Sequence, residues 1–148
     1  MEKVVYIVPN LTYKKGMFKS ASVNLVVTDK RLIVAHITKE MLKEARKEAG
    51  GFLRGITSGF TLYKKYYEME PEKILHETAD NFSIPISEIK EIKLKSGDSE
   101  TGKRDEIEVK WRQKDKFHAS TGSVNIREFR NKLKDLGVNV KGGSFFGF

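Results

Sequence analysis

The strongest constraint on the fold lies in the stretch LVVTDKRLIVAHI, from Leu25 to Ile37. It contains two β-branched apolar runs separated by Thr28-Asp29-Lys30-Arg31, four residues that are typical of a turn. The second run is apolar on one face and mixed on the other, a pattern typical of a strand in a curved antiparallel sheet. The stretch therefore predicts a tight hairpin. Its polar corner is interpreted as a structural device that holds the hairpin, not as a ligand site.

Length and composition predict one globular domain over residues 1–148. The chain is 39% hydrophobic and 32% charged, which is typical of a folded protein. It has no cysteine, and a cytoplasmic location is expected. No run approaches the roughly 20 apolar residues of a spanning helix, so any membrane association is expected to be peripheral, at the inner membrane face.

The positive charge of the chain is concentrated in two regions. The net charge is +8. Residues 1–39 contain seven Lys and Arg against two acids, and residues 103–134 contain ten against five. Two such regions can form one patch facing phosphates or anionic lipid. The alternative is an ordinary solvated surface rich in lysine.

The hydrophobic period divides the rest of the chain. Strands are expected before residue 38 and again between residues 82 and 119, with a bulge or short turn near Ser87-Glu88. Between them, residues 38–80 have helical spacing and form an expected helical insert that begins with Thr38 as its cap. Asn125 caps a final amphipathic helix that ends near Gly137.

Three segments, in this order, resemble the GRAM and bacterial pleckstrin-homology-like (PH-like) families. NLVVTDKRLIVA is similar to their strand-turn-strand signature, FSIPISEIKEIKL to their next landmark, and NIREFRNKLKDL to their closing helix. The resemblance covers most of the chain except residues 38–80 and the tail, residues 141–148. It implies an α+β, mainly β fold: a bent antiparallel seven-stranded sheet or barrel, capped by the C-terminal helix and interrupted by the helical insert.

The resemblance also implies a non-catalytic binding module for anionic lipid headgroups or for a protein partner. Lipid-binding PH domains often carry a basic motif on the first hairpin, and YKKGMFKSAS matches that region with lysines but without the Lys/Arg-x-Arg element. Lysines favour diffuse attraction over bidentate phosphate recognition. The tip Gly16-Met17-Phe18 is expected to be a turn with two partly buried side chains; an apolar wedge into lipid is the alternative. The candidate anionic-surface residues are Lys14, Lys15, Lys19, Arg112, Lys114 and Lys116.

Two other segments suggest an interface. Glycines recur every four residues in GFLRGITSG, which on a helix gives a flat strip for close packing. The strip can pack against the domain's own sheet, a second subunit or a bilayer, and the aromatic tail poses the same choice. The alternative function is therefore a scaffold that self-associates as a homo-oligomer. Its candidate interface residues are Gly51, Phe52, Gly55, Ile56, Gly59, Phe60, Phe145, Phe146 and Phe148.

Patterns for catalysis, metals and nucleic acid are weak. His36, His76 and His118 are far apart in the sequence, and the chain has no His-x-x-x-His pair, nucleophile elbow or P-loop. We therefore expect no enzymatic activity, no metal and no cofactor. Trp111 lies among cations but alternates with Val109, so it is expected in the core, and nucleic acid is not favoured as a partner.

Overall fold

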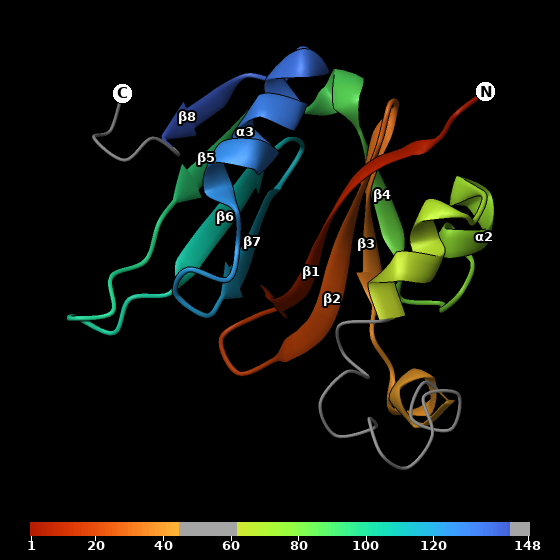
Figure 1. Ribbon diagram of the computed structural model, residues 1–148, viewed down its shortest axis with the longest axis horizontal. Coiled ribbons are helices and arrows are strands. Elements are labelled where there is room, and N and C mark those ends of the chain that lie inside the picture. Colours follow the sequence, from red (N-terminus) through yellow and green to blue (C-terminus); the bar gives the residue numbers. More distant parts are fainter. Residues whose placement is uncertain (45–61, 143–148) are drawn as a thin grey trace. The chain divides into compact units, whose positions relative to one another are not determined.

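The computed structural model describes residues 1–44 and 62–142 (Figure 1). Its strands are β1 (Val4–Lys14), β2 (Ser20–Thr28), β3 (Arg31–His36), β4 (Phe82–Pro85), β5 (Glu91–Lys95), β6 (Asp105–Lys110), β7 (Lys114–Ala119) and β8 (Val140–Gly142). Its helical elements include the 3₁₀ turns η1 (Leu62–Tyr67) and η2 (Ile86–Glu88), and the helices α2 (Pro71–Leu75) and α3 (Ile126–Asp135). The fold is α+β and mainly β, as predicted.

The strands form one open, mixed sheet in the order β4-β3-β2-β1-β7-β6-β5-β8. This corrects the expectation of a seven-stranded antiparallel sheet or barrel, because an eighth strand pairs in parallel with β5, with Ile92 opposite Val140. The three residues of β8 have no strand pattern of their own. Their conformation depends on β5 as a hydrogen-bonding partner, which a local pattern cannot indicate.

The chain forms two compact units. The first comprises residues 1–10 and 21–83, and the second comprises residues 11–20 and the chain from Ile84 onward. β1 belongs to both, and the change falls at Asn10, whose φ of 56° is left-handed. Asn10 is suited to this conformation, and its N–H donates to Asn24 Oδ1 at 3.0 Å. The prediction of a single domain over residues 1–148 stays a prediction.

The polar corner predicted from the sequence is a structural element of the first unit. Thr28 Oγ1 accepts the N–H groups of Lys30 at 3.1 Å and Arg31 at 2.9 Å, and its hydroxyl donates to the Glu2 carboxylate. The Arg31 guanidinium contacts Glu2 at 2.9 Å and Glu72 at 2.8 Å. The corner therefore ties the β2–β3 hairpin to the N-terminal segment and to α2.

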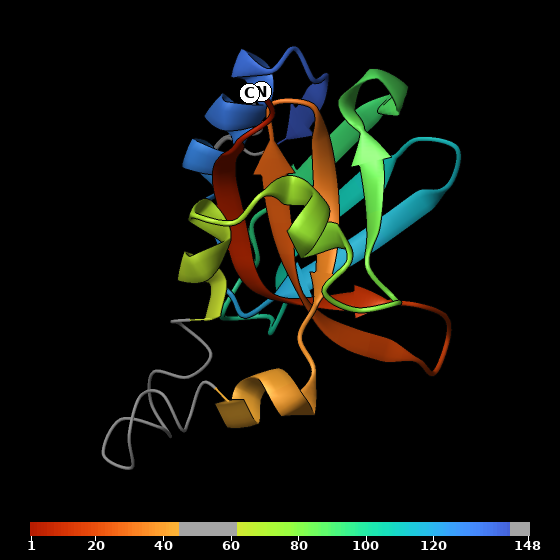
Figure 2. The same cartoon turned by 90° about the vertical axis from the view of Figure 1, so that its right-hand side faces the viewer.

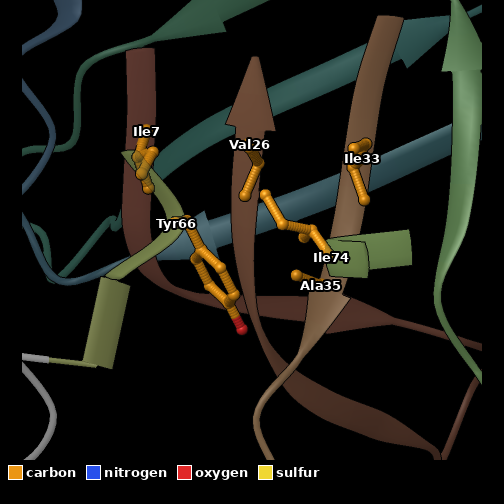
Figure 3. Packing of buried hydrophobic residues seen from close by; sticks show 6 residues of the cluster. All are labelled: Ile7, Val26, Ile33, Ala35, Tyr66 and Ile74. Carbon is orange, nitrogen blue, oxygen red and sulfur yellow. The ribbon is translucent and has the colours of Figure 1, made fainter. Parts of the chain in front are cut away.

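Figure 3 shows the core of this unit, in which Tyr66 of η1 and Ile74 of α2 face Ile7, Val26 and Ile33 on β1, β2 and β3. The Tyr66 hydroxyl donates to Glu77 at 2.6 Å, and burial together with this carboxylate raises the Tyr66 pKa.

Parts of the predicted insert are described. Residues 39–44 are helical, and Thr38 Oγ1 accepts the Met41 N–H at 3.1 Å, which confirms the predicted cap. Pro71 occupies the first turn of α2, where its fixed backbone angle suits a helix.

In the second unit, the buried side chains of α3 are Ile126, Phe129 and Leu133. The predicted cap is confirmed, because Asn125 Oδ1 accepts the Glu128 N–H at 3.1 Å. Gly137 has a φ of 82°, as a helix-terminating glycine requires. The turn η2 confirms the short turn predicted near Ser87-Glu88.

Thr28→Val tests the structural role of the corner. The variant keeps the shape of the side chain but leaves two N–H groups and the Glu2 carboxylate without this partner. We expect the free energy of unfolding to fall by about 2 kcal/mol, measured by urea denaturation. Thr101→Val, in an exposed loop, is the matched control and should change it by less than about 0.5 kcal/mol. Equal stability of the two variants would contradict the assignment.

Candidate anionic-surface site

The loop between β1 and β2, residues 15–19, presents apolar side chains to solvent. The Lys15 N–H donates to the Lys19 carbonyl at 2.9 Å and closes the loop. Met17 is 89% exposed and Phe18 is 94% exposed. The expectation that these two side chains are partly buried is therefore wrong, because no described element covers the loop. Lys14, Lys15 and Lys19 are also exposed, so two apolar groups lie among three cations.

A buried carboxylate holds the base of this loop. Asp115 of β7 is 4% exposed. It accepts hydrogen bonds from the Tyr13 hydroxyl at 2.7 Å, from Trp111 Nε1 at 2.8 Å and from Gln113 Nε2 at 3.1 Å. The Tyr13 ring also stacks on Phe117, with centroids 5.1 Å apart. Asp115 therefore joins the end of β1 to the turn between β6 and β7.

The network also affects the ionisation of the Tyr13 hydroxyl. Burial, the hydrogen bond to Asp115 and the charge of that carboxylate all raise the Tyr13 pKa. Trp111 is buried, as its alternation with Val109 predicted.

The six predicted cations belong to the same unit and gather near one end of its strands. The pairs Thr12–His118 and Tyr13–Phe117 fix the antiparallel register of β1 and β7, and this register continues to Lys14 and Lys116. The end of β1 thus lies beside the second half of β7 and runs toward its start. In Figure 2 the β1–β2 loop is at the lower right and the β6–β7 turn at the upper right of the view.

Not every predicted cation is equally available. The Arg112 guanidinium lies over the Trp111 ring at 4.4 Å, a cation–π contact. Lys114 and Lys116 lie 3.8 and 3.9 Å from one Glu108 carboxylate oxygen. Lys15 and Lys19, by contrast, form no side-chain ion pair with another described residue.

His118 lies on the same strand as these lysines. Its Nε2 has no hydrogen-bond partner in the described part of the chain, and the nearest carboxylate oxygen, on Glu106, is 3.8 Å away. Burial lowers the His118 pKa; Glu106 opposes this effect, whereas Arg104, Lys14 and Lys116 add to it. The imidazole is therefore neutral at pH 7.

The predicted interface residues, Gly51, Phe52, Gly55, Ile56, Gly59, Phe60, Phe145, Phe146 and Phe148, all lie outside the described residues. Their role stays a prediction. Within residues 1–44 and 62–142, no group of three or more acidic or histidine side chains is arranged to hold a metal ion. No helix in those ranges is long and apolar enough to cross a bilayer.

Four further lysines on the strands of the second unit were not among the cations predicted from the sequence. They are Lys93, Lys95, Lys110 and Lys141. The signal was present, because acidic and basic residues alternate with apolar ones along EIKLK and DEIEVK. Which acidic residue lies opposite each lysine could not be predicted from the sequence, because that depends on the register of the paired strands.

Asp115→Ala tests the anchor. It leaves the Tyr13 hydroxyl and the Trp111 indole N–H without their acceptor in a buried place, so we expect the free energy of unfolding to fall by about 3 kcal/mol. Urea denaturation measures the change. Asp98→Ala, in an exposed loop, is the matched control and should lower stability by far less. An Asp115→Ala variant as stable as the control would show that the network does not hold the loop.

His118 gives a pH test. Because its folded pKa is below the ordinary value of 6.5, the unfolded chain binds the proton more readily. Its contribution to stability is therefore complete above about pH 6.5 and is lost as the pH falls toward the folded pKa. We expect His118→Gln to flatten the stability-against-pH curve below about pH 6.5, measured by urea midpoints. The same slope in His118→Gln and the wild type would refute the assignment.

Comparison with known proteins adds no relative. No family model matches the chain, and no curated protein and no solved structure matches it. Its function is therefore inferred from its own geometry and charge.

Proposed function

We propose that this chain is a non-catalytic binding module that associates peripherally with anionic phospholipid surfaces through its basic loops. The observation that carries the proposal is the exposed pair Met17 and Phe18 at the tip of a loop flanked by Lys14, Lys15 and Lys19. A bilayer surface has the complementary arrangement, with negative headgroups above an apolar layer.

The two kinds of side chain contribute energies of similar size. A lysine near an anionic membrane contributes about 1 kcal/mol, so three contribute about 3 kcal/mol, a factor of about 100 in affinity. Full burial of a Phe or Met side chain contributes roughly 1.5–3 kcal/mol. Neither term alone holds a protein firmly on a membrane, and the combination of an apolar anchor with a basic patch is the usual solution.

The chemistry of the cations favours charge density over headgroup stereochemistry. The three cations of the loop are lysines, which attract phosphate as point charges without the bidentate fork of arginine. The nearby Arg112 stacks on Trp111. The proposed ligand is therefore the anionic surface as a whole. In this proposal the protein is cytoplasmic and meets the inner membrane face, the leaflet that carries anionic lipid.

A PH-like fold of the GRAM or bacterial type is the finer structural part of the proposal. The antiparallel hairpins from β1 to β7 and the C-terminal helix α3 support it. The parallel strand β8 and the open sheet are departures from that pattern. The alternative function, a self-associating scaffold, depends on residues outside the described ranges and stays a prediction.

Vesicle co-sedimentation tests the proposal, with phosphatidylcholine alone against phosphatidylcholine mixed with phosphatidylserine. We expect binding only to the anionic vesicles, weakened by salt. The variant Lys14→Gln/Lys15→Gln/Lys19→Gln should bind about 100-fold more weakly. Met17→Ser/Phe18→Ser should bind at least about tenfold more weakly, because its apolar contribution is lost.

The matched control removes three exposed lysines elsewhere: Lys3→Gln/Lys30→Gln/Lys73→Gln. It has the same net charge as the lysine variant of the loop, so it separates a local site from overall attraction. Equal loss in the two triple variants would refute a localised site, and absence of wild-type binding at low salt would refute the proposed function.

A further inference from the structure

Lysine side chains project from one face of the second unit's strands. Side chains alternate across a strand, and on β5, β6, β7 and β8 the lysine and glutamate side chains fall on the face opposite the buried apolar ones, whereas the buried Asp105 and Asp115 share the apolar face. We call this set the lysine face. Its cations are Lys93, Lys95, Lys110, Lys114, Lys116 and Lys141.

Three glutamates are interleaved with these lysines by the strand register. Glu108 stands opposite Lys116 on β7 and opposite Lys93 on β5. Glu106 stands opposite Lys95 and Glu91 opposite Lys110, in both cases across the β5–β6 pair. Residues opposite each other in such pairs are near neighbours, so each carboxylate has a cation beside it.

The charges of the two signs differ in depth. The side chains of the three glutamates are between 11% and 20% exposed, whereas those of the lysines that form ion pairs with them are between 31% and 68% exposed. The carboxylates are therefore recessed and the ammonium groups stand outward. A ligand approaching the face meets more positive charge than the residue count indicates, because the nearest charges dominate its interaction.

Two of the lysines also crowd each other. Contact with the Lys110 side chain lowers the Lys93 pKa, whereas the same contact together with the Glu91 carboxylate raises the Lys110 pKa. Lys110 Nζ lies 3.5 Å from a Glu91 carboxylate oxygen, so a carboxylate already stands beside this pair.

We propose that the lysine face is a second docking surface for the same anionic bilayer, continuous with the β1–β2 loop through Lys14 and Lys116. This inference rests on the proposed function and adds where the second contact lies. The β1–β7 register, extended by one residue from the Tyr13–Phe117 pair, places Lys14, at the base of the loop, beside Lys116 on the face. Phosphate headgroups supply the complementary charge over an extended area.

Other occupants fit less well. Lysine is depleted in the cores of protein–protein interfaces, which favour aromatic and apolar groups. Single-stranded nucleic acid is usually held by exposed aromatic side chains. The large hydrophobic side chains exposed in the described ranges are Met1, Met17, Phe18 and Tyr67, and none belongs to the lysine face.

Paired variants of opposite sign test the inference. Lys93→Gln/Lys95→Gln/Lys141→Gln removes three cations of the face and leaves the loop intact; we expect binding to phosphatidylserine vesicles to weaken at least about tenfold. Glu106→Gln removes a recessed carboxylate, and we expect binding to strengthen several-fold. The control is again Lys3→Gln/Lys30→Gln/Lys73→Gln, and urea midpoints verify that each variant is folded.

Contact is tested directly by labels, since the chain has no cysteine. A fluorophore on Lys95→Cys should become shielded from an aqueous quencher when anionic vesicles are added. The same fluorophore on Lys134→Cys, exposed on α3, should stay accessible.

The outcomes separate the two proposals. If the wild type does not bind vesicles, both fail. If the loop variants lose binding while the face variant binds like the control and the label at residue 95 stays accessible, the lysine face is overturned and the loop site stands. If the face variant instead loses affinity for a random oligonucleotide and keeps its affinity for vesicles, the face serves nucleic acid and this inference is wrong.

Discussion

The candidate site depends on the hydrogen bonds that the buried Asp115 carboxylate accepts. Its three partners, Tyr13, Trp111 and Gln113, come from the end of β1 and from the β6–β7 turn, so one buried anion fixes both segments that present cations. A buried carboxylate is favourable only with its hydrogen bonds satisfied, and here neutral donors satisfy it without consuming a lysine. Asp115 therefore forms no ion pair with a lysine of the described ranges, and Lys114 and Lys116 lie beside Glu108 instead. The anchor and the exposed charge are two consequences of one arrangement.

Around this anchor, the second unit places three kinds of side chain in different locations. Apolar side chains of β5, β6, β7 and α3 form a core, the opposite face of the strands has recessed carboxylates beneath lysines, and the β1–β2 loop exposes Met17 and Phe18. Exposed apolar groups beside cations are unfavourable in water but suited to the boundary of a bilayer. The first unit shows a different use of charge: Arg31 is consumed by Glu2 and Glu72 and holds the hairpin corner. The charge of a residue alone therefore does not identify a binding site. Whether each cation already has an acidic partner must be considered as well.

A feature of this structure could be predicted from the sequence when residues close together in the chain determine it. The Leu25–Ile37 hairpin, the Asn125 cap and the Gly137 terminus were predicted because a few neighbouring residues determine each. β8 was missed because its three residues become a strand only against β5. The exposure of Phe18 was misjudged because burial depends on whether a distant element covers the loop. The six cations of the candidate site were named from the sequence, but the position of Glu108 beside Lys114 and Lys116 required the strand register.

The most direct test of the central claim is the depth of residue 18 in a bilayer. In Phe18→Trp a second tryptophan stands at the loop tip, and the wild type, whose single tryptophan Trp111 is buried, gives the background emission. On addition of phosphatidylserine vesicles, the emission of the second tryptophan should shift to the blue and be quenched by lipids brominated on the acyl chains, with no change for phosphatidylcholine alone. Emission that stays that of a solvated indole, under conditions in which the protein sediments with the vesicles, would contradict insertion of the loop.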